Sequence, residues 1–146
     1  MSASDARVPR PAPLSFLAFD YGTRHTGLAT GNTLLRRAQP LKTLHVAGQA
    51  RWAAIGEVIR QWQPNALVVG VPFHPDGAPH ENTERARRFV RQLRARYALP
   101  VHEVDERYTT TQARAEGARD LDAASAAIIL DQFFAAADDP DTRGPG

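Results

Sequence analysis

The chain alternates short runs of apolar residues with segments in which apolar residues recur at helical spacing. The runs predict strands at residues 14–20, 26–33, 38–46, 66–71 and 100–105. Helical spacing and capping residues predict helices at 49–62, from Asn82 or Thr83 to Tyr97, at 109–117 and at 122–137. Pro40 places the third strand at a sheet edge, because proline donates no ladder hydrogen bond.

The order of these elements predicts the architecture. The first three strands are close enough in sequence to form a meander, whereas each later strand follows a helix and favours parallel pairing through a right-handed crossover. We therefore expect an α/β fold with a mixed five-stranded sheet, a three-strand meander plus two parallel strands, flanked by helices. Residues 1–13 and 138–146 are rich in proline and small or polar residues, which predicts disordered tails around a single domain at 14–137.

The composition narrows the classes of function. The 146 residues include no cysteine, which excludes disulfide scaffolds, thiol catalysis and cysteine-based zinc sites. No apolar run is long enough to span a membrane, and residues 1–13 lack the apolar stretch of a secretory signal. A cytoplasmic protein without membrane contact is therefore expected.

Basic charge is concentrated in one predicted helix. The whole chain has a net charge of only +2, yet six arginines and one glutamate lie between residues 84 and 97. Such a local field is typical of a surface that faces phosphates, and Arg88 and Arg91 are its candidate contacts. The alternative interpretation is a solvated helix face.

Acidic residues stand where the chemistry of an α/β sheet is usually found. Asp20 ends the first strand within D-Y-G-T-R, where Gly22 leaves room for an anionic ligand. Asp105 and Glu106 end the last strand and point to opposite faces, so one of them is expected to serve a site. Asp122 lies in the first turn of the final helix. Each has a structural alternative. Asp20 could cap its own turn, an acid at 105–106 could pair with the neighbouring Arg107, and Asp122 could be an N-cap or a favourable partner of the helix dipole.

Carboxylates that converge from these positions would suit Mg²⁺ or Mn²⁺, which prefer oxygen ligands. Two such ions about 4 Å apart activate water and stabilise the leaving oxygen in phosphodiester hydrolysis. Arg24, Arg107 and the arginine-rich helix could supply the cations that a phosphoryl transition state also needs. The pattern therefore indicates a metal-dependent hydrolase of nucleic-acid backbones.

Four segments in order resemble the YqgF/RuvX-type Holliday-junction-resolvase-like family, whose members are described as pre-16S rRNA processing nucleases. They read LAFDYGTRHTGLA, VVGVPFHPDG, LPVHEVDERYTT and LDAASAAIILDQFF. The resemblance covers about residues 17–134 and implies an RNase H-like fold in a bacterial cytoplasmic protein that matures the 5′ end of 16S rRNA. It implies that the catalytic, metal-binding acids are Asp20, Glu106 and Asp122, with Arg107, Thr109 and Thr110 near the substrate.

The chain departs from the family pattern at three places. Thr26 stands where an apolar residue usually precedes the glycine, and His74-Pro75 replaces the commoner Asn-Met. The segment 117–121 is shorter than the loop that usually precedes the third acid. The resemblance therefore leaves open how this protein grips its RNA.

Other functions fit parts of the pattern. D-Y-G-T also resembles the first phosphate motif of actin-like sugar kinases and ATPases, but that architecture needs two such domains and this chain has length for one. A non-catalytic nucleic-acid-binding module would keep the sheet and the arginine-rich helix. A DNA junction resolvase would share the chemistry, act on branched DNA and require a symmetric dimer. The sequence contains no heptad pattern and no long exposed apolar stripe that would predict a strong dimer, so a monomer or weak homodimer is expected.

Two further groups of residues receive structural interpretations. His74 and His80 flank Asp76 and could bind zinc, but a solvated loop is the simpler reading. Trp52 and Trp62 share the inner spacing of one predicted helix, so both are expected in the core rather than stacked on bases.

Overall fold

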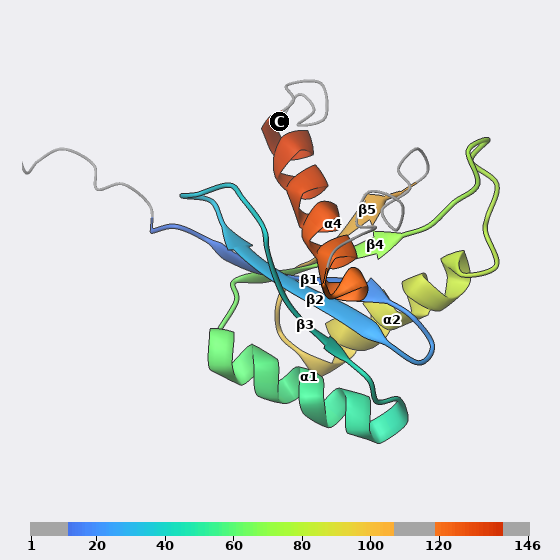
Figure 1. The fold of residues 1–146 in the computed structure, drawn as a ribbon, viewed down its shortest axis with the longest axis horizontal. Coiled ribbons are helices and arrows are strands. Elements are labelled where there is room, and N and C mark those ends of the chain that lie inside the picture. Colours follow the sequence, from blue (N-terminus) through green and yellow to red (C-terminus); the bar gives the residue numbers. More distant parts are fainter. Residues whose placement is uncertain (1–11, 107–118, 139–146) are drawn as a thin grey trace, which may run out of the picture.

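The computed structural model describes residues 12–106 and 119–138, which build one mixed sheet with helices on both of its faces (Figure 1). The strands are β1 (Ser15–Tyr21), β2 (Thr26–Asn32), β3 (Gln39–Leu44), β4 (Ala66–Val71) and β5 (Val101–Asp105). The helices are α1 (Gly48–Trp62), α2 (Thr83–Arg96) and α4 (Leu121–Asp138). The predicted helix at 109–117 lies outside the described residues.

The sheet has five strands in the order β3-β2-β1-β4-β5. The meander β1-β2-β3 is antiparallel, and β4 pairs parallel with both β1 and β5. The predicted architecture is therefore confirmed, with the edge position of β3 that Pro40 indicated. None of the described helices has the length and apolar character needed to cross a lipid bilayer.

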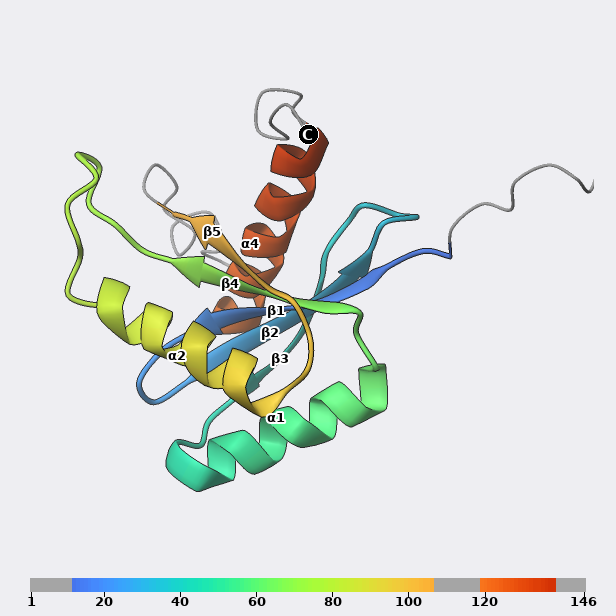
Figure 2. The ribbon, with the colours of Figure 1, turned by 180° about the vertical axis from the view of Figure 1, so that it is seen from behind.

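Side chains that alternate along the strands divide the core into two layers. Leu17 and Phe19 of β1 face α1 and α2, whereas Phe16 and Ala18 face α4. The same alternation on β4 places Leu67 toward α1 and α2. Figure 2 shows α1 and α2 together on one side of the sheet and α4 alone on the other. This division matters for the site, because Asp20 continues the series that faces α4.

Two details of the sequence prediction need correction. Trp62 is 42% exposed rather than buried, because it ends α1 beside an open hollow of about 190 Å³ that it lines together with Phe16 and Leu35. Asn82 occupies the N-cap position of α2 without a side-chain cap bond. The Thr83 hydroxyl instead donates to the Pro72 carbonyl and accepts from the His80 N–H, so it ties the helix to the preceding loop.

Candidate active site

Asp20 lies near the end of β1 on the face covered by α4. Its direct cross-strand partner on β2 is Gly27. A Cβ atom on Gly27 would lie 1.9 Å from the carbonyl oxygen of Asp122. Only glycine therefore lets the first turn of α4 rest directly on β2, and this contact brings Asp122 next to Asp20.

The first turn of α4 is capped by Asp120 and not by Asp122. The Asp120 carboxylate accepts the backbone N–H of Ala123 at 3.2 Å, and its carbonyl accepts that of Ala124 at 2.9 Å. The Thr43 hydroxyl on β3 also donates to the Asp120 carboxylate. The helix-cap alternative for Asp122 is thus wrong, and its carboxylate is not needed to begin the helix. Asp120 was not predicted as a cap from the sequence, although it stands three residues before Ala123, as a cap requires.

Glu106 approaches the same place from β5. Its backbone N–H donates to the Val71 carbonyl at 3.0 Å, which extends the β4–β5 ladder by one residue. A Cβ atom on Gly70 would lie 2.5 Å from Oε2 of Glu106 and equally close to Cδ1 of Ile129. Gly70 thus provides the space that the Glu106 carboxylate occupies above β4, under α4.

The three acids are close enough to influence one another electrostatically. The pKa of Asp20 is raised from 3.8 to about 7, first by burial and then by the negative charges of Glu106 and Asp122. Among the described residues, no three histidine, aspartate or glutamate side chains already form a chelating group. The three carboxylates therefore interact through their charges, but their oxygens are not arranged as a chelating group. A cation among these carboxylates would relieve the repulsion that raises the Asp20 pKa.

The predicted cationic contacts fall into three groups. Arg24 is exposed in the turn between β1 and β2, at the end of the sheet that carries Asp20. Arg107, Thr109 and Thr110 lie outside the described residues. Arg88 and Arg91 lie on α2, which packs against the opposite face of the sheet from α4.

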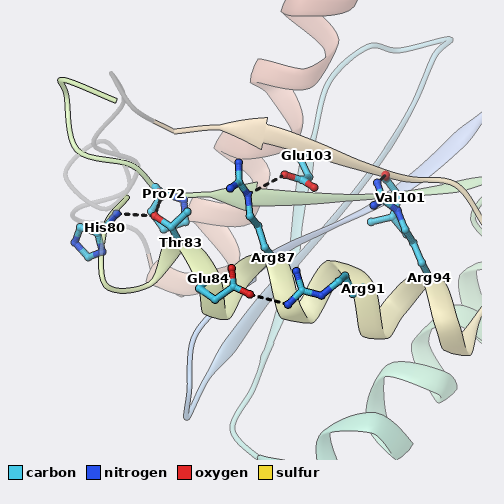
Figure 3. A network of polar contacts seen from close by, with 9 residues as sticks. All are labelled: Pro72, His80, Thr83, Glu84, Arg87, Arg91, Arg94, Val101 and Glu103. Atoms are coloured by element: carbon cyan, nitrogen blue, oxygen red, sulfur yellow. Dashed lines mark hydrogen bonds and ion pairs between the residues drawn. The ribbon is translucent and has the colours of Figure 1, made fainter. Parts of the chain in front are cut away.

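Several arginines of α2 make contacts within the protein (Figure 3). Arg91 pairs with Glu84 at 2.7 Å, and Arg87 lies 3.8 Å from Glu103 of β5. Arg94 donates to the Val101 carbonyl, and the Arg96 guanidinium lies 4.1 Å from the centre of the Trp52 ring. The high arginine content of this helix is thus partly structural. Exposed pairs such as Arg91–Glu84 contribute little stability and can exchange partners.

A buried arginine that the sequence analysis overlooked fixes the turn after Asp20. Arg51, in the first turn of α1, is 5% exposed. Its guanidinium donates to the carbonyls of Gly22 at 2.8 Å and Thr23 at 2.7 Å, and it stacks over Tyr21. A sequence signal exists, because Arg51 shares the inner face of α1 with Ile55 and Val58, and a charge on an apolar stripe needs partners.

The mixed five-stranded sheet and its flanking helices form an RNase H-like fold. The chain resembles Thermus thermophilus RuvC in complex with a Holliday junction substrate, with a TM-score of 0.55 and 18% identity over 85% of this chain and 95% of that one. It also resembles the Fowlpox virus resolvase, with a TM-score of 0.53 and 7% identity over 86% of this chain and 100% of that one. At such identities the likeness shows the fold alone.

Sequence similarity identifies the family. Residues 14–136 match RuvX, described as Holliday junction resolvase, and the chain belongs to this family. A Polaromonas protein named "Putative pre-16S rRNA nuclease" is 65% identical over 120 residues, which cover 82% of this chain and 87% of that protein. A Paraburkholderia phytofirmans protein of the same name is 49% identical over 134 residues, 87% of this chain and 92% of that protein. The resemblance found in the sequence is confirmed.

Proposed function

We propose that this protein is a metal-dependent nuclease that hydrolyses phosphodiester bonds of structured RNA, in the 5′-end maturation of pre-16S rRNA during ribosome biogenesis. The observation that carries the proposal is the meeting of Asp20, Glu106 and Asp122 at one end of the α4 face, where Gly27 and Gly70 leave room for them. The names of the related proteins support the choice of substrate.

The acid cluster fits Mg²⁺ or Mn²⁺, because its donors are carboxylate oxygens, the ligands that these hard cations prefer. Asp20, Glu106 and Asp122 would hold the ions, which supply an activated water and stabilise the leaving oxygen. The chain itself positions these carboxylates through backbone contacts: β1 fixes Asp20, the β4–β5 ladder fixes Glu106, and the first turn of α4 fixes Asp122. Such support limits the reorganisation needed when substrate binds.

Arg24 is the described arginine best placed to meet a backbone phosphate beside the acids, and we propose Arg107, Thr109 and Thr110 as further contacts. Arg88 and Arg91 would meet RNA only where it passes to the other side of the sheet. Replacing both by glutamine should weaken binding and flatten its dependence on salt by about two counterions. A salt dependence equal to that of the unchanged protein would make the α2 arginines purely structural.

The proposal is tested by cleavage of a labelled pre-16S 5′ leader, with Mg²⁺ or Mn²⁺ and with EDTA. Asp20→Asn should remove cleavage while RNA binding and the circular dichroism spectrum persist. Glu57→Gln is the matched control, since it neutralises an exposed acid on α1, across the sheet from the site. Cleavage by Asp20→Asn at the normal rate would overturn the site. RNA binding by the unchanged protein without cutting in any metal would favour a non-catalytic module.

A Holliday-junction resolvase is the second candidate, favoured by the family description and by the likeness to RuvC. A four-way DNA junction assayed beside the RNA leader separates the two. Resolution of a junction requires two symmetric cuts and therefore a dimer. We propose a monomer or weak homodimer with one domain at 14–137, acting in the cytoplasm. Junction cutting by a stable dimer, with the RNA leader left intact, would move the assignment to the resolvase.

A further inference from the structure

Two exposed histidines meet at the end of the sheet that carries the acids. In the β2–β3 ladder Thr26 pairs with Leu44 and Gly27 with Thr43. His25 and His45 are the next opposed positions in this register, which accounts for their contact across the two chains. Their Nδ1 atoms lie 2.8 Å apart, in an N–H···N hydrogen bond whose donor depends on the tautomers, and their ring centres are separated by 4.8 Å.

The histidine pair stands on the same side of the sheet as the acids. Gly27 and Thr43 both face α4, because one contacts the backbone of Asp122 and the other bonds to Asp120. His25 stands two residues before Gly27 and His45 two residues after Thr43, the spacing that keeps side chains on one face of a strand. Asp20 pairs with Gly27, and His25 stands two residues before Gly27 in the turn between β1 and β2.

The separation of the two nitrogens suits a particular coordination geometry. Metal–imidazole bonds are about 2.0–2.1 Å long. Two nitrogens 2.8 Å apart would therefore subtend roughly 85° at a shared ion. A tetrahedral ion would require them to stand about 3.3–3.4 Å apart. The near right angle is that of neighbouring ligands in square-planar or tetragonal sites, which Cu²⁺ and Ni²⁺ prefer.

We propose that His25 and His45 form a second cation site, distinct from the acid cluster, which binds a borderline transition-metal ion through both Nδ1 atoms. The described residues bring no third protein ligand to it. The other coordination positions are therefore open to water or to an oxygen of a bound anion. Imidazole nitrogen selects such ions over Mg²⁺, whereas the carboxylates of the acid cluster favour Mg²⁺. The two sites are thus separated by ligand chemistry.

The other histidine pair of the chain provides an internal comparison. The rings of His74 and His80 are also close, with centres 5.0 Å apart. However, Nδ1 of His80 accepts the backbone N–H of Asn82 at 3.1 Å, so a metal ion there would leave a backbone donor unpaired, whereas Nδ1 of His25 and Nδ1 of His45 bond to each other. We therefore expect no chelation by His74 and His80, and His74→Gln is the matched control for His25→Gln.

The test is titration of the full chain with Ni²⁺ by calorimetry, in excess Mg²⁺ that occupies the acid cluster, with a parallel Cu²⁺ titration followed by electron paramagnetic resonance. One ion per chain and a Cu²⁺ spectrum with two nitrogen ligands are expected. His25→Gln and His45→Gln should each weaken Ni²⁺ binding at least about tenfold, since even loss of an outer-shell partner costs that much. His74→Gln should leave it unchanged.

Each outcome decides the proposal without reference to RNA cleavage. Equal Ni²⁺ affinity in the unchanged protein and in both single variants would overturn it and reduce the pair to a shared N–H···N hydrogen bond. Loss of binding in His74→Gln would overturn it as well, by moving the ion to the other loop. Circular dichroism of each variant separates loss of a ligand from loss of folding, and the two variants provide independent readings.

Discussion

The two faces of the central sheet are built from the same strands but differ in the size of their side chains. The face toward α1 and α2 is filled by large side chains, among them Leu17, Phe19, Leu28, Leu67, Phe89 and Leu93. The face toward α4 carries many small residues, among them Ala18, Gly27, Ala29, Ala66 and Gly70, with Ala123, Ala126 and Ala127 opposite on the helix. One face buries apolar area, and the other lets a helix approach closely.

The α4 face is itself graded along the strands. Near the start of β1, Phe16 packs against Phe133 and Phe134, with ring centres 5.1 and 5.7 Å away. Near the end of β1 the aromatic rings give way to glycine, and the first turn of α4 touches the backbone of β2. Aromatic side chains thus pack α4 against the start of β1, and near its end the glycines leave space for the acidic side chains. The site therefore depends on the absence of side chains at Gly27 and Gly70.

The largest effect is expected from adding a side chain at Gly27, where β2 contacts the backbone of α4. Gly27→Ala places a Cβ atom 1.9 Å from a backbone oxygen of α4, which cannot be relieved by a side-chain rotation. We expect a loss of about 3 kcal/mol in the free energy of unfolding, measured by urea denaturation, because overpacking against fixed backbone is costly. Cleavage should also fall, since Asp122 would be displaced.

Gly56→Ala on α1 is the matched control on the other layer. Its Cβ atom would stand 3.4 Å from the Tyr97 hydroxyl, an ordinary contact, and alanine is favoured over glycine inside a helix by about 0.5–1 kcal/mol. We expect this variant to be at least as stable as the unchanged protein. If Gly27→Ala and Gly56→Ala behaved alike, the close seating of α4 on β2 would be refuted.

The next largest effect is expected from the negative charge of Asp20 and its acidic neighbours near the end of β1. Because the folded pKa of Asp20 is raised to about 7, the native state binds its proton more tightly than the unfolded chain. The stability lost to this carboxylate therefore grows as pH rises from about 4 to 7, by at most roughly 4 kcal/mol. In EDTA, Asp20→Asn should melt several degrees above the unchanged protein at about pH 8.

At about pH 4 both proteins carry a neutral group at this position, so the difference in melting temperature should shrink toward zero. Mg²⁺ added at about pH 8 should raise the melting temperature of the unchanged protein more than that of Asp20→Asn. A melting-temperature difference that is constant over this pH range would show that burial and neighbouring charges do not act on Asp20 as described.

Local pattern was sufficient for most of the fold. The β-branched run at 66–71 predicts β4 with the observed bounds, and the spacing at 49–62 predicts α1 within one residue. These elements are specified by their own periodicity and by glycine or proline at their ends. The mixed sheet followed from connection lengths, which limit the available pairings. Trp62 was misplaced because helical spacing alone does not show where the facing layer ends.

The site was predictable only in part, because it depends on contacts between distant segments. Strand ends and the family resemblance pointed to Asp20, Glu106 and Asp122 as candidates. The register that sets Gly27 opposite Asp20, and the reach of Glu106 over Gly70, cannot be read from spacing. The same holds for the carbonyls that satisfy Arg51. Such residues become visible only when the partner strands are placed.

The smallest effect is expected within the ladder that flanks the site. Thr26 is fully buried, and in the described part of the chain its hydroxyl has no hydrogen-bond partner. Thr26→Val removes that unpaired group with little change in shape, so we expect a gain of about 1 kcal/mol in the free energy of unfolding.

Thr83→Val is the matched control, because the buried Thr83 hydroxyl bonds to Pro72 and His80. It should lose about 1–3 kcal/mol. A fall in the urea midpoint of Thr26→Val as well as of Thr83→Val would contradict the assignment, because it would mean that the Thr26 hydroxyl is also satisfied in the folded protein.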